Sequence, residues 1–171
     1  MPEKSTANAD KIDVYALSAE SRTFEASYPV ASMASLAGLL ADASGQIEVS
    51  LTGTRGAKGM PGAVMTLSGL LNLSCTVCGK PVVFSLEREV PFLFAASESA
   101  LNAIPIEDDM GYEITVGSRS FDVKALAEEE AILSLPAFPK HRGCRMPVAR
   151  DEEEARNRIR PFAGLKKLIS S

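Results

Sequence analysis

Two runs of alternating apolar residues, separated by a short turn, constrain the fold of this 171-residue chain more than any other feature. Apolar side chains recur at every second position over Ala63–Cys75, with the small Gly69 in the same series, and the alternation resumes over Val82–Leu86. Successive side chains of a strand point to opposite faces, so each run predicts a strand with one buried face. Because only Thr76–Lys80 and a proline separate the runs, they predict a β-hairpin with this segment as its turn.

Shorter apolar segments on both sides of the hairpin predict further elements. The expected strands are Ile12–Leu17, Thr23–Val30, Gln46–Thr54, Tyr112–Val116 and Ser120–Val123. The expected helices are Ala31–Ala41, Val123–Leu135 with Asp122 as its cap and Pro136 at its end, and Asp151–Arg160. Gly53–Gly62 and Ala95–Gly111 are expected to be loops. Strands without alternating βαβ units predict an α+β fold: an antiparallel β-sheet core with a few packed helices and a basic C-terminal tail.

Charge is divided unevenly along the chain. Residues 1–139 hold 9 basic and 18 acidic side chains, whereas residues 140–171 hold 9 basic and 4 acidic ones. Residues 1–10 are polar and without pattern, so we expect a disordered N-terminus, a single domain over 11–139 and a basic C-terminal segment over 140–171. Clustered basic side chains displace counterions from phosphate, so the segment predicts contact with RNA or an acidic partner; a merely solvated terminus is the alternative.

Some classes of protein are disfavoured by what the sequence lacks. It has no run approaching the ~20 apolar residues of a membrane-spanning helix and no apolar signal core near its start, so a cytoplasmic location is expected. It has no Trp and few other aromatic residues, which argues against a broad single-strand nucleic-acid binder. Three cysteines, an odd number, indicate metal or redox chemistry rather than structural disulfides.

The cysteines and the single histidine fall into two pairs of matching spacing. Cys75 and Cys78 form a CxxC sequence followed by glycine in the predicted hairpin turn, which is the form of a zinc knuckle. His141 and Cys144 are likewise separated by two residues. Together the pairs make a complete Cys3His set, so the sequence predicts a zinc site formed by these four residues.

Three other interpretations stay open at this stage. Cys75 lies on the inward side of its strand and can be ordinary core packing. The CxxC pair can be a dithiol of a thiol-dependent redox enzyme, although such pairs usually begin a helix, and here the flanks are predicted strands. His141 can be a surface histidine on a loop flanked by proline.

Sequence signals for catalysis are weak. With one histidine and no GxSxG sequence, a Ser-His-Asp triad would have to recruit His141. The glycines of Gly53–Gly59 lack the spacing of a phosphate-binding loop. Glu128–Glu130 occupy consecutive helix positions and spread around the helix, which favours a solvated or partner-facing surface over a catalytic carboxylate pair. We therefore expect that the protein is not an enzyme.

Three longer stretches together carry a family resemblance. They are Leu73–Pro81, Phe121–Pro136 followed by Pro139–His141, and Arg160–Leu168. In this order they resemble the YceD family of large ribosomal RNA subunit accumulation proteins, in its bacterial type, with similarity over about Gln46–Leu168. The family's signature positions correspond to Cys75, Cys78, Asp122, Glu128, Glu130, Pro136 and His141. Thr76 and Val77, between the two cysteines, differ from the polar and basic residues that the family often has at these positions, which argues against phosphate binding by the turn of the zinc knuckle.

The resemblance implies a role in the synthesis, processing or stability of 23S rRNA, without an established catalytic activity. We expect a factor that contacts large-subunit rRNA, a ribosomal protein or an rRNA-processing factor, with no membrane and no small-molecule substrate. The expected contact residues are Lys140, Arg142, Arg145, Arg156, Arg158, Arg160, Lys166 and Lys167, together with the acidic Glu128 and Glu130.

Overall fold

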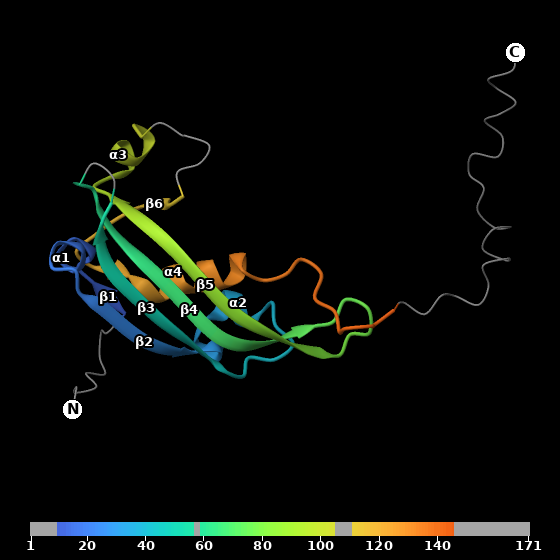
Figure 1. The fold of residues 1–171 in the computed structure, drawn as a ribbon. Coiled ribbons are helices and arrows are strands. Elements are labelled where there is room, and N and C mark those ends of the chain that lie inside the picture. The colour runs from blue at the N-terminus through green and yellow to red at the C-terminus, as the bar shows by residue number, and fades with distance from the viewer. Residues whose placement is uncertain (1–9, 57–58, 105–110, 146–171) are drawn as a thin grey trace, which may run out of the picture.

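A five-stranded sheet forms the centre of the computed structural model, which describes residues 10–56, 59–104 and 111–145 (Figure 1). Its strands, in spatial order, are β2 (Thr23–Pro29), β3 (Gln46–Arg55), β4 (Pro61–Ser74), β5 (Pro81–Ala95) and β6 (Glu113–Val116). A two-stranded sheet pairs β1 (Lys11–Ile12) with β7 (Phe121–Asp122). The helices are α1 (Val14–Ala19), α2 (Ala34–Ala37), α3 (Glu98–Asn102) and α4 (Val123–Leu133). The predicted α+β class is confirmed, although β6 joins β5 in parallel.

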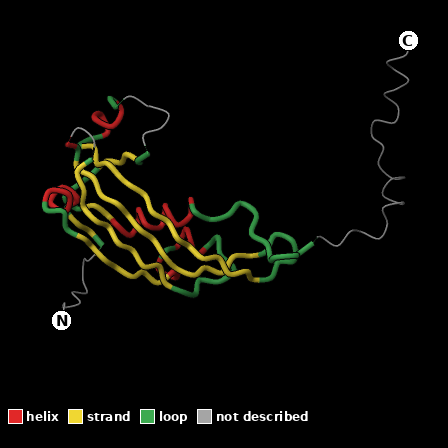
Figure 2. The backbone as a smooth tube through the Cα atoms, in the orientation of Figure 1, coloured by secondary structure: helices red, strands yellow, loops and turns green. Residues whose placement is uncertain are grey.

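The predicted hairpin is confirmed and is the longest feature of the sheet. β4 and β5 pair antiparallel from Gly62 opposite Leu93 to Ser74 opposite Pro81. β5 extends well beyond the predicted end at Leu86. The prediction was too short because the charged residues 87–89 interrupt the apolar pattern, although alternate side chains remain on the buried face at Val90 and Phe92. The hairpin therefore reaches past the other strands at the end where its turn lies (Figure 2).

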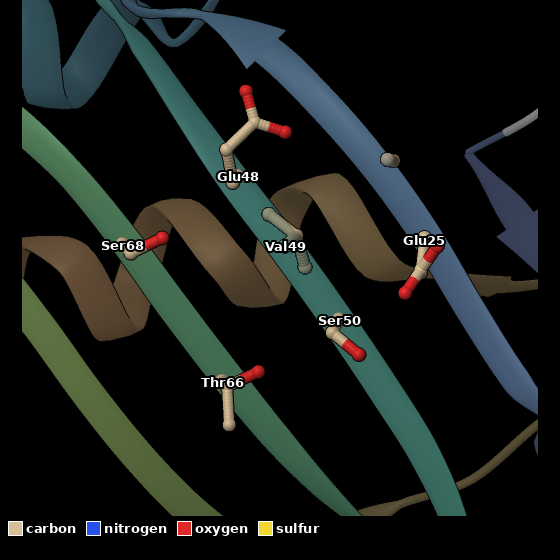
Figure 3. A pocket seen from close by; sticks show the side chains of 7 residues that line it. Glu25, Glu48, Val49, Ser50, Thr66 and Ser68 are labelled. Atoms are coloured by element: carbon tan, nitrogen blue, oxygen red, sulfur yellow. The ribbon is translucent and has the colours of Figure 1, made fainter.

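α3 lies beside β6, outside the main layer, whereas α2 and α4 lie on one face of the sheet and α4 runs across it (Figures 1 and 3). The core fills the space between them with the inward side chains of the strands, such as Leu51, Met65 and Leu71. The opposite face carries polar side chains, among them Glu48, Ser50, Thr66 and Ser68 (Figure 3). This division into an apolar and a polar face is what alternating strand sequences predict.

The strand predicted over Ile12–Leu17 is wrong for most of its length. Only Lys11–Ile12 pairs as a strand, and α1 begins at Val14. The Asp13 side chain accepts hydrogen bonds from the backbone N–H groups of Tyr15 and Ala16, so it caps α1 and ends the strand.

The helix predicted over Ala31–Ala41 is much shorter in the structure. A 3₁₀ turn over Val30–Ser32 precedes α2, which has one turn. The Glu128 carboxylate on α4 accepts hydrogen bonds from the N–H groups of Ser35 (2.6 Å) and Leu36 (3.0 Å). A short helix is thus held at its amino end by a side chain from another helix, which sequence spacing does not reveal.

The predicted loops are shortened, and the remaining elements agree closely with expectation. The loop expected over Gly53–Gly62 is shorter, because β3 continues to Arg55 and β4 begins at Pro61. The loop expected over Ala95–Gly111 contains the short helix α3. The predictions for β2, β3, β6, β7 and α4 are confirmed, with Asp122 accepting a hydrogen bond from the N–H of Ala125 as the cap of α4. The helix predicted over Asp151–Arg160 and the lead-in at residues 1–9 lie outside the described residues.

A buried carboxyl joins α4 to the sheet. Glu130 is 2% exposed, and its Oε2 lies 3.5 Å from a guanidinium nitrogen of Arg88 on β5. The same guanidinium nitrogen lies 3.5 Å from the carboxylate of Glu113 on β6. Burial raises the pKa of Glu130 above its ordinary value of 4.5, and the nearby Glu113 adds to this, while Arg88 opposes it.

The raised pKa predicts how acid affects stability through Glu130. Because the folded state holds this proton more tightly than the unfolded state, the group's stabilisation is complete below pH 4.5 and is lost as the pH rises through the raised pKa. Replacing Glu130 with Gln removes that loss, so the variant is expected to gain free energy of unfolding relative to wild type between pH 4 and pH 8. Urea unfolding at both values measures this, with the exposed neighbour Glu129→Gln as control. An equal pH dependence in wild type and Glu130→Gln would contradict it.

Candidate metal centre

The hairpin turn brings the first pair of candidate ligands to the surface. Cys75 directly follows β4 and is 2% exposed, whereas Cys78 is exposed. The Cys75 N–H donates to the Lys80 carbonyl, and the Gly79 N–H donates to the Cys75 carbonyl, both at 2.9 Å. Gly79 has a φ of +71°, a conformation that favours glycine, so this residue allows the turn to close tightly.

The segment that follows α4 returns to this turn. Both the N–H of Thr76 (2.9 Å) and its hydroxyl (3.1 Å) donate to the carbonyl of Pro139, so the turn and the segment are joined directly. Figure 2 shows the two loops together at the end of the sheet away from α1. His141 and Cys144 follow within five residues, and the Cys144 N–H donates to the His141 carbonyl at 3.1 Å.

The four ligand atoms lie together in the arrangement that the sequence predicted. The Sγ atoms of Cys75, Cys78 and Cys144 and a ring nitrogen of His141 all lie within 4.8 Å of one another. The Cys75 and Cys144 sulfurs are 3.9 Å apart, and the Cys78 sulfur is 3.5 Å from His141 Nδ1. Tetrahedral zinc with bonds of ~2.3 Å to sulfur and ~2.0 Å to nitrogen separates two sulfurs by about 3.8 Å and a sulfur from a nitrogen by about 3.5 Å. The Cys75–Cys144 and Cys78–His141 separations are therefore close to those around a bound zinc ion.

The histidine is oriented by a second contact. Its Nε2 lies 2.9 Å from the carbonyl of Pro81, the first residue of β5. A carbonyl oxygen can only accept, so Nε2 carries the proton and donates, which leaves the lone pair of Nδ1 facing the sulfurs. Metal-binding histidines are commonly fixed in this way by a backbone carbonyl.

The thiols differ in acidity because of their surroundings. Burial raises the pKa of Cys75, but hydrogen bonds from the backbone N–H groups of Cys78, His141 and Val77 outweigh it and lower the pKa to about 5. Burial and the neighbouring sulfurs of Cys78 and Cys75 raise the pKa of Cys144 to about 11. Thiolates crowded together oppose each other's ionisation, and a divalent cation is the charge that allows all three to ionise.

These observations show a site that could bind a metal ion through Cys75, Cys78, His141 and Cys144. Three sulfurs and an imidazole nitrogen are the donor set that favours zinc. Four protein ligands complete a tetrahedron and leave no position for a substrate, which is the arrangement of structural rather than catalytic zinc.

The expected basic contact residues divide between the metal centre and the undescribed tail. Lys140, Arg142 and Arg145 are exposed and lie among or next to the candidate ligands in sequence. Arg156, Arg158, Arg160, Lys166 and Lys167 lie outside the described residues.

The acidic residues expected to face a partner are engaged within the fold. Glu128 caps α2, and Glu130 is buried beside Arg88, so Glu130 is not on a surface that a partner can reach. Glu129 is the exposed member of the three, as their spread around the helix predicts. The open face of the sheet instead holds exposed carboxylates, with Glu25 and Glu48 beside a hollow of about 440 Å³ (Figure 3).

Three residues at the centre were missed by the sequence reasoning. Thr76 joins the two loops, and the Pro81 carbonyl orients His141. Each contact joins two segments about sixty residues apart through a backbone carbonyl, and a single sequence carries no signal of such a contact. Lys80 is exposed in the turn and adds a basic side chain to this end of the molecule, and its position two residues after the CxxC pair is the sequence signal for it.

The fold and site define an α+β protein with a candidate structural metal centre at one end of its sheet. None of the helices within the described ranges has the length and apolar character that crossing a membrane requires. The family model described as large ribosomal RNA subunit accumulation protein YceD matches residues 63–169, so the chain belongs to this family. Searches of curated proteins and of solved structures returned no match. The family assignment made from the sequence is confirmed, and the match begins somewhat later than Gln46.

Proposed function

We propose that this protein is a non-catalytic factor in 23S rRNA synthesis, processing or stability, acting in the cytoplasm through a zinc-stabilised basic end. The observation that carries the proposal is the convergence of Cys75, Cys78, His141 and Cys144 at the point where the basic C-terminal segment begins. The family name supplies the process, because it describes accumulation of the large ribosomal RNA.

A structural metal is favoured over a dithiol redox centre by the surroundings of the CxxC pair. Cys75 is buried, and the pair lies in a turn between two strands rather than at the start of a helix, where redox pairs usually lie. His141 Nδ1 also faces the Cys78 sulfur, which a metal site requires and a dithiol pair does not. The bound ion would hold the turn and the post-helix segment in place.

The basic side chains at this end suit contact with phosphate. Lys80, Lys140, Arg142 and Arg145 are exposed around the ligands, and they are followed in sequence by the basic residues of the tail. Attraction to the RNA backbone requires little base recognition, which agrees with the scarcity of aromatic residues.

Binding to an rRNA fragment is expected to weaken when these charges are removed. The triple variant Lys140→Gln, Arg142→Gln and Arg145→Gln is expected to bind a labelled large-subunit rRNA fragment at least ~10-fold more weakly, because three phosphate contacts are lost. The slope of log affinity against log salt should fall in magnitude by about 2, at ~0.7 per contact. Fluorescence anisotropy over a salt series measures both quantities.

A matched control removes three exposed charges from the other end of the molecule. Lys11, Arg22 and Arg119 lie near α1, and their replacement with Gln should leave affinity for RNA nearly unchanged. Wild-type affinity that does not change between low and moderate salt would reject the RNA contact. Equal losses in both triple variants would reject the basic end as its location.

A basic ribosomal protein is the second partner that the charge distribution favours. Exposed carboxylates of Glu25, Glu48, Glu87 and Glu89 lie on the open face of the sheet, away from the basic end. Docking there would let the metal-centred end approach RNA. Crosslinking in cells, with joint identification of bound RNA and protein, distinguishes direct RNA contact from an effect through such a partner.

A further inference from the structure

An apolar groove lies beside the metal centre on the helix-covered side. It has a volume of about 330 Å³ and is formed between the end of α4, the chain after α2 and the end of β4. Leu39, Leu73, Ile132, Leu135 and Pro139 line it, and Ser74 is the one lining residue with a polar side chain. The groove is thus a surface that water solvates poorly.

The groove is marked further by exposed apolar side chains. Leu39, which lines it, is 56% exposed, and Leu133 and Phe138, next in sequence to lining residues, are 69% and 79% exposed. The described part of the chain has five large apolar side chains exposed to this degree, and three of them either line the groove or follow or precede a lining residue in sequence. Exposed apolar side chains beside a groove are typical of a binding surface.

The sequence supplies an apolar segment of matching character near its end. Over Pro161–Ile169, Phe162, Leu165, Leu168 and Ile169 recur at helical spacing, with Lys166 and Lys167 between them. The family match over residues 63–169 includes both this segment and every groove-lining residue but Leu39. The segment and most of the groove therefore lie within the region that the family model covers.

The chain leaves the described region beside the groove. Pro139 lines it, and the described residues end at Arg145, just after the ligand Cys144. Fifteen residues separate Arg145 from Pro161, and they can span about 50 Å at ~3.3 Å per residue. A tether of this length gives the segment an effective concentration near the groove on the order of millimolar, far above that of a separate molecule.

We propose that the apolar residues of Pro161–Ile169 bind in this groove of the same chain. The segment returns to the body next to the metal centre, and Phe162 and Leu165 cover the surface formed by Leu39, Leu133 and Phe138. Lys166 and Lys167 then lie close to Lys140 and Arg142, which joins the two halves of the basic sequence into one surface. The zinc ligands fix the start of the tether, so the groove and its occupant are held near each other.

Hydrogen–deuterium exchange of the zinc-loaded, full-length protein tests this binding. Backbone amides over residues 132–138 should exchange about tenfold more slowly in wild type than in the variant Phe162→Gln with Leu165→Gln, as for a groove covered nine-tenths of the time. The double variant Lys166→Gln with Lys167→Gln alters the polar side of the same segment and should retain the protection. Conversely, Leu133→Gln with Phe138→Gln changes exposed residues and should increase exchange over residues 161–169.

The outcomes separate the possible occupants. Equal exchange in wild type and in the Phe162 and Leu165 variant would overturn the proposal. Protection that disappears on dilution, together with a dimer in sedimentation, would assign the groove to a second copy and also overturn it. No RNA enters the experiment, so its result does not depend on the proposed RNA contact.

Discussion

Replacing Cys78 with serine is expected to abolish stoichiometric zinc binding, with one zinc per chain in wild type and none retained in the variant. Cys78 is one of four candidate ligands, and its sulfur lies 3.5 Å from His141 Nδ1. Even the loss of a supporting residue around a metal commonly costs ~10–100-fold in affinity, so the loss of a ligand should cost at least ~100-fold. Metal analysis of purified protein and competition with a chelator measure this.

Loss of the ion should also destabilise this end of the protein. An ion present at a thousandfold excess over its Kd contributes about 4 kcal/mol to the free energy of unfolding. Cys78 is exposed, so its replacement leaves no buried cavity, and the destabilisation can be assigned to the metal. Chelation of wild-type protein should reproduce the effect, and hydrogen exchange should place it at the turn and at residues 139–145.

The neighbouring variant Ser74→Ala serves as control, because Ser74 is exposed, precedes the ligands and is not among them. It should keep both zinc and stability. Purified wild-type protein that is free of metal and carries a reactive thiol of low pKa would contradict the zinc site and favour redox chemistry.

Replacing Gly53 with alanine is expected to lower the free energy of unfolding by about 3 kcal/mol, because α1 packs directly on the backbone of β3. A Cβ at Gly53 would lie 2.1 Å from the carbonyl oxygen of Leu17 and 2.9 Å from Cα of Ser18. These are backbone atoms, so no side-chain rotation relieves the overlap, and the helix itself must move. Urea unfolding followed by circular dichroism measures the loss.

The displacement of α1 would also break a buried hydrogen-bond bridge. The Ser18 hydroxyl donates to the Thr54 carbonyl at 2.5 Å and accepts from the Gly62 N–H at 3.1 Å, linking the helix to both neighbouring strands. Gly38→Ala is the matched control, because its added methyl group meets atoms only at 3.5 Å and beyond. An equal effect of the two substitutions would show that helix propensity or chain entropy, rather than this close approach, determines the result.

Much of the sheet and the spacing within each pair of candidate ligands could be predicted because their signals are local. The alternation over Ala63–Cys75 and the CxxC sequence fix a hairpin with thiols in its turn, and the spacing of His141 and Cys144 completes the ligand set. Asp122 before an apolar periodic run likewise predicts the start of α4.

The parts that sequence reasoning missed depend on contacts between distant segments. The length of α2 depends on Glu128 from another helix, and Glu130 is buried because Arg88 and Glu113 from two strands meet it. The role of Thr76 depends on Pro139, whose carbonyl accepts its hydrogen bonds from a segment about sixty residues away. Propensity and periodicity report the preferences of a segment, but not the polar groups that tertiary contacts bring to it.

The separation of the ligand pairs along the chain has a consequence for how the protein is made. Translation delivers the hairpin with Cys75 and Cys78 some sixty residues before His141 and Cys144, so the nascent chain first presents only two of the four candidate ligands. A zinc ion would be held weakly by this half of the site, and tightly only once α4 has formed and the loop after it has reached the turn. Metal binding at this centre would therefore follow the folding of the sheet and of α4 rather than precede it.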